Sequence, residues 1–356
     1  MSANFRINPA RLVAEVVEGL SPRLKGMIVL RFGLEDGKRR TLEAIGQKYS
    51  ITRERVRQIQ NDAYKYLTKD VIISKVKPLF ETLQEHLEEY GGVRKEATLF
   101  ESDLVSSGTI DLSKPQQRAA IYFALNLSPA FERHLETDLW HTYWSSRRNA
   151  PQLVKRVASA LVDNFEKKGI TFKEDEVREL VDKILTKQRQ FKGLVPEKVI
   201  NAYFGLVRPV AKNIYGEFGL RSWPQINPVG VRDKANLVFQ KLKKPMHFTE
   251  VAKAINAAGF SKRLAHPQTV HNELIKDPRF VLIGRGIYAL KEWGYMPGTV
   301  KDVLIDILKK NSRPLNKEEI MVEIAKQRMV KPNTVALNLQ NKNYYKRTLE
   351  GRYTIA

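Results

Sequence analysis

Two short helical patterns joined by a tight turn occupy residues 41–60 and constrain the fold more than any other stretch. Thr41 and Thr52 each stand directly before a helical pattern, where a hydroxyl can cap the first turn. Ser50 lies at the turn, and Gly46 lies where close helix approach favours a small residue. The apolar positions that the two helices would share as a core are Ile45, Tyr49, Ile51, Val56 and Ile59. This spacing predicts a helix-turn-helix.

The second helix of the motif would expose side chains suited to reading base edges in a major groove. These are Arg53, Glu54, Arg57 and Gln58, with Asn61 one turn further along. Guanidinium, carboxylate and amide groups hydrogen-bond to base edges, and the first turn of such a helix enters the groove deepest. The plainer alternative is a solvated charged face on an ordinary helix. The combined fit of the core positions, cap and turn favours the motif.

The residues around the motif resemble region 4 of bacterial sigma factors of the housekeeping type. The resemblance runs from about residue 20 to 67 and rests on LSPRLKGMIVLRFGL, LEAIG and TRERVRQI. In that family the second helix reads the −35 promoter element, which implies base contacts by the four residues named above. The side chains that the resemblance and the motif suggest for the DNA backbone are Thr41, Thr52, Arg55 and Lys65.

Three departures from the sigma pattern limit what the resemblance implies. Ser50 stands where such motifs usually place glycine, at a cost of about 1 kcal/mol for positive φ. Gln60 replaces the glutamate with which the family usually ends the motif. The aromatic-rich domain that opens the −10 element has no counterpart, and the resemblance covers about 50 of 356 residues. It therefore implies binding to promoter-like duplex DNA without autonomous promoter melting.

Charge and composition narrow the class of partner. The chain has 61 Lys and Arg against 39 Asp and Glu, a net charge of +22, which favours polyanions and above all double-stranded DNA. It has no Cys, which excludes disulfides and thiolate metal sites. We expect no metal, no cofactor, no small-molecule substrate and no membrane segment. Because no catalytic motif is found either, we expect a protein without enzymatic activity, in the cytoplasm and associated with the nucleoid.

An internal repeat predicts the organisation of the rest of the chain. Helical patterns are followed by short aromatic, strand-like text around Tyr215, Tyr288 and Tyr353. Helices followed by a small hairpin are typical of winged helices, so we expect a mainly α protein, with the helix-turn-helix followed by a tandem array of winged-helix domains with small β-wings. The predicted domains are 1–70, 71–149, 150–228, 229–297 and 298–356. Residues 71–149 carry 9 basic and 11 acidic side chains and are the segment least expected to touch phosphates.

The fourth segment resembles a second known family. HFTEVAKAINAAGF and HPQTVHNELIKDPRFVLIGRGIYALKEWGY, within about residues 229–295, resemble the HARE-type winged helix, also found in the delta subunit of Gram-positive RNA polymerase. Gly284 and Gly286 bracket Arg285, which suits a wing tip. We expect the exposed side chains to contact the DNA backbone, namely Gln268, His271, Lys276 and Arg285. A metal site at His266 and His271 is disfavoured, because i, i+5 positions do not share a helix face. Tyr288 and Trp293 are expected to pack the hairpin rather than to stack on bases.

The last segment repeats this arrangement with less specific signals. Helices are expected at 317–326 and 331–341, and Lys346, Arg347 and Arg352 flank the closing strands. Phosphate contact and a plain exposed basic face fit these three residues equally well.

Taken together, the sequence predicts a sequence-specific DNA-binding protein acting in transcription, as a sigma-like regulator or RNA polymerase accessory factor. Two alternatives stay open: a protein–protein adaptor built of winged helices, and a non-catalytic DNA-binding subunit of a nuclease or restriction system. Double-stranded DNA is the expected partner, with RNA polymerase as a second.

Overall fold

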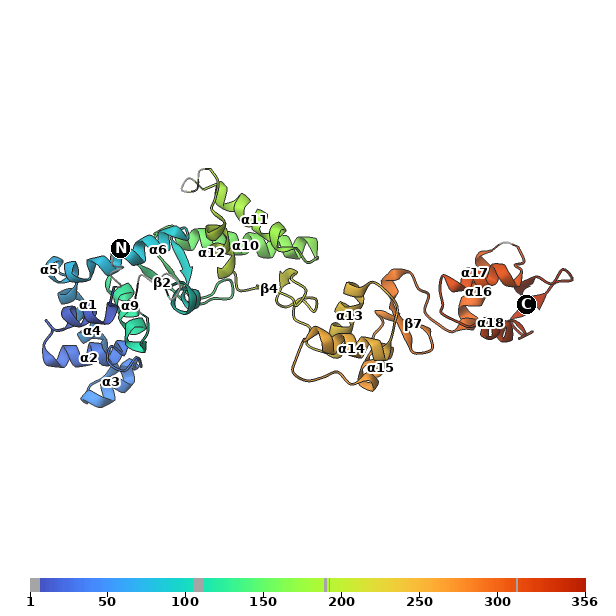
Figure 1. The fold of residues 1–356 in the computed structure, drawn as a ribbon, viewed down its shortest axis with the longest axis horizontal. Helices are drawn as coiled ribbons and strands as arrows, with labels where there is room; N and C mark the ends of the chain where they lie inside the picture. Colours follow the sequence, from blue (N-terminus) through green and yellow to red (C-terminus); the bar gives the residue numbers. More distant parts are fainter. Residues whose placement is uncertain (1–6, 105–109, 111, 189–190, 192, 312) are drawn as a thin grey trace, which may run out of the picture. The chain divides into compact units, whose positions relative to one another are not determined.

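The computed structural model describes residues 7–104, 110, 112–188, 191, 193–311 and 313–356. The chain forms two compact units, Met1–Ala211 and Lys212–Ala356, and is mainly helical with small antiparallel sheets (Figure 1). Within the described ranges, no helix is both long enough and apolar enough to cross a bilayer.

The helices and strands follow one another in short runs. Up to residue 145 they are α1 (Pro9–Val17), α2 (Pro22–Phe32), α3 (Leu42–Tyr49), α4 (Arg53–Leu67), α5 (Asp70–Ile73), η1 (Ser74–Val76), α6 (Lys77–Glu89), β1 (Val93–Lys95), α7 (Glu96–Thr98), η2 (Leu99–Asp103), α9 (Pro115–Leu127), β2 (Glu132–His134) and β3 (Tyr143–Ser145). Up to residue 242 they are α10 (Ala150–Lys168), α11 (Glu174–Thr186), α12 (Glu197–Leu206), β4 (Val210–Lys212), β5 (Phe218–Leu220) and α13 (Val231–Leu242). The remaining elements are β6 (Met246–His247), α14 (Phe248–Ala258), α15 (Pro267–Lys276), β7 (Phe280–Gly284), β8 (Ile287–Leu290), η4 (Lys291–Trp293), α16 (Val300–Lys310), α17 (Lys317–Ala325), α18 (Pro332–Leu339), β9 (Tyr345–Arg347) and β10 (Tyr353–Ile355).

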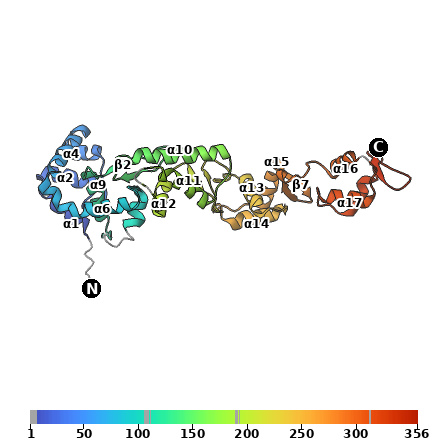
Figure 2. The ribbon, with the colours of Figure 1, turned by 90° about the horizontal axis from the view of Figure 1, so that it is seen from above.

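The N-terminal helices share their core with a helix from much later in the chain. The lead-in helix α1 buries the face marked by Val13, Val16 and Val17. Helix α9 packs against α1 and α2, and the ring of Phe123 lies edge-on to that of Phe32 at 5.0 Å between centroids. Figures 1 and 2 show α1, α2, α4 and α9 gathered in one region of the first unit. The first 70 residues are therefore completed by residues of the following segment.

Two segments repeat one order of helices and strands. In the first, α6, β1, α7 with η2, and α9 precede β2 and β3, and the sheet order is β1-β3-β2. In the second, α13, β6, α14 and α15 precede β7 and β8, and the sheet order is β6-β8-β7. In both, the strand that follows the first helix pairs with the last strand.

Two further segments follow the same order with fewer strands. Helices α10, α11 and α12 lie together and precede the β4–β5 hairpin (Figure 2). Helices α16, α17 and α18 precede β9 and β10, and an isolated bridge between Leu315 and Tyr353 stands in place of the early strand.

The tyrosines that suggested the repeat are not equivalent. Tyr288 and Tyr353 lie in closing strands, whereas Tyr215 lies in the turn before β5. The side-chain oxygen of Asn213 closes that turn by accepting hydrogen bonds from the backbone of Tyr215 and Glu217. The five-domain division stays a prediction, because the chain clusters into only two units.

Candidate nucleic-acid interface

The site is built on a small core beneath α2, α3 and α4. Met27, Ile45, Val56 and Ile59 are buried together, and Tyr49 and Ile51 pack against them half-buried. All five predicted core positions thus belong to one cluster, and α2 supplies the third side. This core fixes the angle between α3 and α4 and leaves the opposite face of α4 to solvent.

The turn between the two helices needs an unusual backbone and a close approach. Ser50 has φ 53° and ψ 45°, the left-handed conformation that the sequence predicts. A Cβ on Gly46 would lie 2.6 Å from the carbonyl oxygen of Ile51, which is too close for any side chain. The amide of Ile51 donates to the carbonyl of Gly46 at 2.9 Å, so the turn is closed by its own backbone.

Both predicted caps are present, and each leaves a donor for a ligand. The hydroxyl oxygen of Thr41 accepts from the amide of Ala44 at 3.1 Å, and that of Thr52 accepts from Arg55 at 3.2 Å. A threonine that accepts through oxygen still has its O–H to donate. Since both residues are exposed at the starts of helices, their hydroxyls can meet phosphate oxygens.

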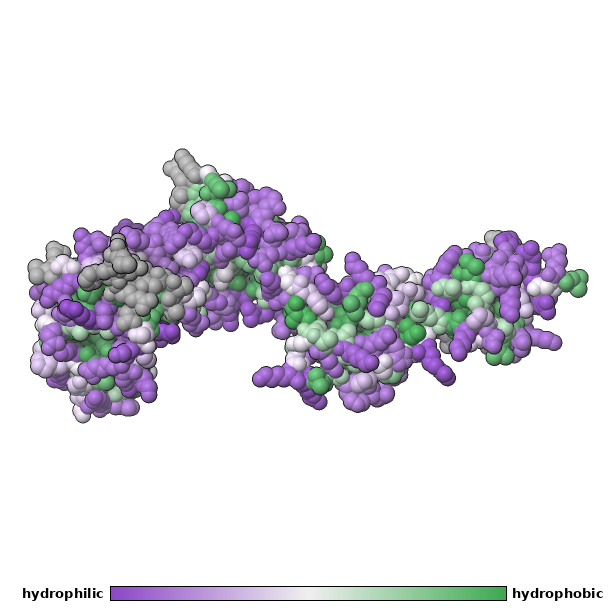
Figure 3. All heavy atoms as spheres, viewed as in Figure 1, coloured by the Kyte–Doolittle hydropathy of each residue, from purple (hydrophilic) through white to green (hydrophobic). Residues whose placement is uncertain are grey.

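The outer face of α4 carries the predicted base-reading side chains. Arg53, Glu54, Arg57 and Gln58 are all exposed, as is Asn61 one turn along. At 3.6 residues per turn, positions 54, 58, 61 and 65 lie opposite the buried row of Val56, Ile59 and Ala63. Figure 3 shows mainly hydrophilic side chains over the region of α3 and α4 on the face in view.

Within this face the charged and amide groups are already paired with one another. Arg57 donates two hydrogen bonds to the Glu54 carboxylate, at 2.9 and 2.7 Å. The hydrogen bond from Arg57 lowers the pKa of Glu54, so Glu54 stays ionised. Arg55 donates to the side-chain oxygen of Gln58 at 3.1 Å. These exposed pairs contribute little to stability, but they hold the groups of the face in defined positions.

One supporting residue was not foreseen from the sequence. Arg31, at the end of α2, donates from Nη1 to the carbonyl of Arg40 at 2.9 Å, and the amide of Arg40 donates to Leu30. These two bonds anchor the chain directly before the Thr41 cap. The only sequence signal is an arginine inside an otherwise apolar helical run, which does not reveal the partner.

The other predicted backbone contacts, in α4 and in the later segments, fall into two groups. The exposed ones are Arg55, Lys65, Gln268, Lys276, Arg285, Lys346 and Arg347. Arg285 lies at the turn between β7 and β8, as predicted for a wing tip. Arg352 is half-buried and lies 3.8 Å from Glu319 and 3.6 Å from Glu350, so its charge is partly used within the protein.

The expected exposure of His271 is wrong. The side chain is half-buried, its ring packs 4.5 Å from that of Phe248, and its Nδ1 lies 3.1 Å from the Tyr288 hydroxyl. His271 therefore packs among aromatic side chains of its own segment. Helical spacing alone does not show this packing. Tyr288 is itself buried and Trp293 packs on the same core, as expected for packing rather than base stacking.

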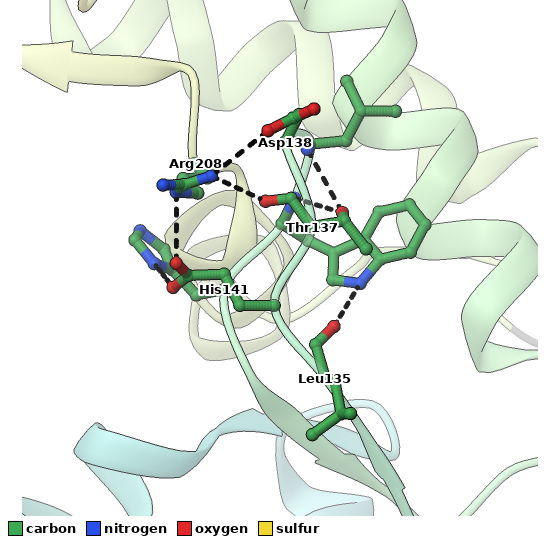
Figure 4. A network of polar contacts seen from close by, with 8 residues as sticks. Leu135, Thr137, Asp138, His141 and Arg208 are labelled. Atoms are coloured by element: carbon green, nitrogen blue, oxygen red, sulfur yellow. Dashed lines mark hydrogen bonds and ion pairs between the residues drawn. The ribbon is translucent and has the colours of Figure 1, made fainter.

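The loop between β2 and β3 is bound to the end of α12 and to the two residues that follow it, Val207 and Arg208. Arg208 donates from Nη1 to the Thr137 carbonyl at 3.0 Å and lies 3.4 Å from Glu136 (Figure 4). The backbone of His141 donates to Leu206 at 2.9 Å. This loop stands in the same place in its segment as the β7–β8 turn, and it is occupied by contacts within the protein.

The residues that the structure describes hold no group of three or more His, Asp or Glu placed to bind a metal ion. The exposed site is a helix-turn-helix with a polar, mixed-charge second helix. Its chemistry suits hydrogen bonding to base edges and phosphates.

Comparison with known proteins identifies this region. Residues 16–69 match the family model for Sigma-70, region 4. RNA polymerase sigma factor SigA of Nostoc sp. is 49% identical over 53 residues, which are 15% of this chain and 14% of the relative. SigA of Clostridium acetobutylicum is 42% identical over 66 residues, 18% of this chain and 17% of the relative. RpoS of Coxiella burnetii is 43% identical over 70 residues, 17% of this chain and 20% of the relative.

These matches confirm the resemblance to sigma region 4, and the family match begins a few residues earlier than expected, within α1. The chain spans about a fifth or less of the length of these relatives. The family match covers the end of α1 together with α2, α3 and α4.

Proposed function

We propose that this protein binds double-stranded DNA sequence-specifically and acts in transcription, reading a −35-like element through the major groove. The observation that carries the proposal is the exposed face of α4, with Arg53, Glu54, Arg57 and Gln58 on a helix-turn-helix that matches sigma region 4. Each good bidentate base contact discriminates by about 1–3 kcal/mol. Thr41, Thr52, Arg55 and Lys65 would position the motif on the DNA backbone.

The later segments would form a tandem array of winged helices. Their support is the repeated order of three helices and a closing hairpin, and for residues 229–295 the resemblance to the HARE-type module. Gln268, Lys276 and Arg285 would add phosphate contacts there, and Lys346 and Arg347 would add them in the last segment.

RNA polymerase is the proposed protein partner, because region 4 belongs to polymerase subunits in the relatives that match. The protein would act as a sigma-like accessory factor without enzymatic activity, in the cytoplasm at the nucleoid. Affinity capture from a native lysate tests this part: polymerase subunits should be enriched, and their absence would remove the polymerase from the proposal. Metal-dependent cutting of supercoiled DNA would instead identify a nuclease activity.

A protein–protein adaptor is the second candidate, favoured by the acidic balance of residues 71–149, which carry 9 basic and 11 acidic side chains. A filter-binding salt titration on duplex DNA separates the two. A protein that contacts six to ten phosphates loses affinity by about 10³–10⁵-fold between about 50 and 200 mM salt. A flat response or no binding would favour the adaptor.

A further inference from the structure

The first unit contains a cavity of about 500 Å³ that the DNA-reading face does not use. It lies between the α2–α3 loop, the start of α9, the β1–α7–η2 segment and the β2–β3 loop. None of the four predicted base-reading residues lines it. Its size falls in the range of sites that bind small organic molecules, about 300–1,000 Å³.

Two arginines form a cationic wall in this cavity. The guanidinium of Arg39 stacks on the ring of Tyr122, 4.1 Å from the centroid. Arg118 precedes Tyr122 by four positions on α9, so the two side chains share a helix face. Both arginines are exposed, and in the ranges that the structure describes neither forms an ion pair. A stacked guanidinium keeps its N–H edge available, which suits a carboxylate, phosphate or sulfonate.

The loop that carries Arg39 is held in place. Gln116 donates from Nε2 to the carbonyl of Glu35 at 2.7 Å. Gly37 has φ +74° and lies so close to Pro115 that no side chain fits between them. The two arginines are therefore presented by packed segments, which lowers the entropic cost of binding between them.

Two of the carboxylates that line the cavity are already neutralised. Glu96 accepts two hydrogen bonds from Arg133 at 2.6 and 2.7 Å, and one from the Trp144 indole at 2.9 Å. Glu136 is held by Arg208 at 3.4 Å and lies 3.3 Å from His141. Figure 4 shows the contacts by which Arg208 holds the loop that carries Glu136 and His141. Of the other charged side chains that line the cavity, Arg39, Lys95 and Arg118 are basic and Glu101 is acidic, so the local balance remains positive.

The lining also offers an apolar surface. Phe100 projects from η2, a π-helical turn, and Ala97, Ala119 and the Tyr122 ring complete it. π-helical turns occur frequently at functional sites. An occupant would therefore need both a negative group and an apolar body.

We propose that this cavity is a binding site for a small organic anion with an apolar or planar body. Arg39 and Arg118 bind the negative group, and Phe100 and Tyr122 contact the body. The inference goes beyond the proposed DNA-binding function and does not depend on it.

A matched pair of probes on the full chain tests the proposal without DNA. The anion 8-anilinonaphthalene-1-sulfonate and the neutral N-phenyl-1-naphthylamine share an aromatic body and differ in the sulfonate. The anion should bind saturably at one site per chain, and the neutral probe at least about tenfold more weakly, as loss of a charge-assisted hydrogen bond implies. Arg118→Ala and Arg39→Ala should each weaken binding of the anion about tenfold.

Arg156→Ala is the control, because Arg156 is an exposed arginine of α10 outside the cavity. This variant should bind both probes as the unaltered chain does. Equal binding of both probes, or anion binding that survives both cavity variants, would overturn the proposal. Displacement of the anion by equimolar duplex DNA would also overturn it, by assigning the two arginines to the DNA interface.

Discussion

Replacing glycine by alanine should have opposite effects on stability at two helical positions. At Gly46 an added Cβ would meet the carbonyl of Ile51, whereas at Gly205, in α12, it would meet nothing within 4 Å. Gly46→Ala should lower the free energy of unfolding by about 1–3 kcal/mol, because the turn must shift. Gly205→Ala should raise it by about 0.5–1 kcal/mol through reduced backbone entropy. Urea titration measures both, and a neutral Gly46→Ala would contradict the close packing of the turn.

The surroundings of Asp103 predict that the first unit loses stability in acid. Its carboxylate is buried, accepts from Arg94 at 2.8 Å and lies 3.5 Å from His86. Burial alone would raise the pKa of Asp103, but the hydrogen bonds from Arg94 and the nearby His86 ring outweigh burial and hold that pKa well below its usual value. The resulting stability is therefore fully present above about pH 4 and is lost as the pH falls below that value.

Asp103→Asn should lower the free energy of unfolding at neutral pH by about 1–3 kcal/mol and flatten its fall below about pH 4. Asp163, exposed on α10, supplies the control Asp163→Asn, which should leave the pH profile unchanged. An unaltered acid limb in Asp103→Asn would show that other carboxylates govern acid unfolding. Thermal melts from about pH 3 to 7 provide the measurement.

At the scale of elements, α9 is expected to stabilise the helix-turn-helix from a distance in sequence. Phe123 is fully buried against Phe32 of α2. Phe123→Ala should lower the free energy of unfolding by about 3–5 kcal/mol and speed amide exchange in α4. Phe172→Ala, a buried phenylalanine beside α10, should leave α4 exchange less affected. Undiminished protection of α4 in Phe123→Ala would mean that the motif folds independently.

The β2–β3 loop offers a second test among the elements. Arg208→Ala removes the side-chain bond to Thr137 and the ion pair with Glu136, while the backbone bond from His141 to Leu206 stays. If the loop loses about 1.4 kcal/mol of local stability, the amide of His141 should exchange about tenfold faster. Hydrogen exchange of this loop in Arg156→Ala gives the baseline. No change at His141 would show that the backbone contacts alone hold the loop.

Local patterns explain what the sequence could predict. Helix caps, turn and shared core at residues 41–60 depend on neighbours a few positions apart, and the structure places Thr41, Ser50, Thr52 and Ile45 as expected. The exposed face of α4 follows from the same periodicity. The α9 contacts with α1 and α2 could not be predicted in this way, because nothing in either pattern specifies a partner about 100 residues away. His271 was misjudged for a related reason, since its partners Phe248 and Tyr288 lie on other elements.

At the scale of the whole molecule, the region-4 match covers residues 16–69, and the remaining segments repeat a different plan of three helices and a hairpin. The segments after residue 149 carry more basic than acidic side chains, unlike residues 71–149. This distribution suits the proposed protein, in which α4 would select the sequence and the basic segments would add affinity. Changes on α4 should therefore alter base preference, and changes such as Lys346→Ala should weaken binding to all sequences alike.

Selection of binding sites from a pool of random duplexes tests the central claim most directly. The full chain should enrich one −35-like motif, and the variants Arg53→Ala and Gln58→Ala should each lose preference at a base position while non-specific affinity stays nearly intact. Arg156→Ala should enrich the same motif as the unaltered chain. Enrichment of no motif, or full sequence preference in both α4 variants, would contradict the assignment of α4 as the DNA reader.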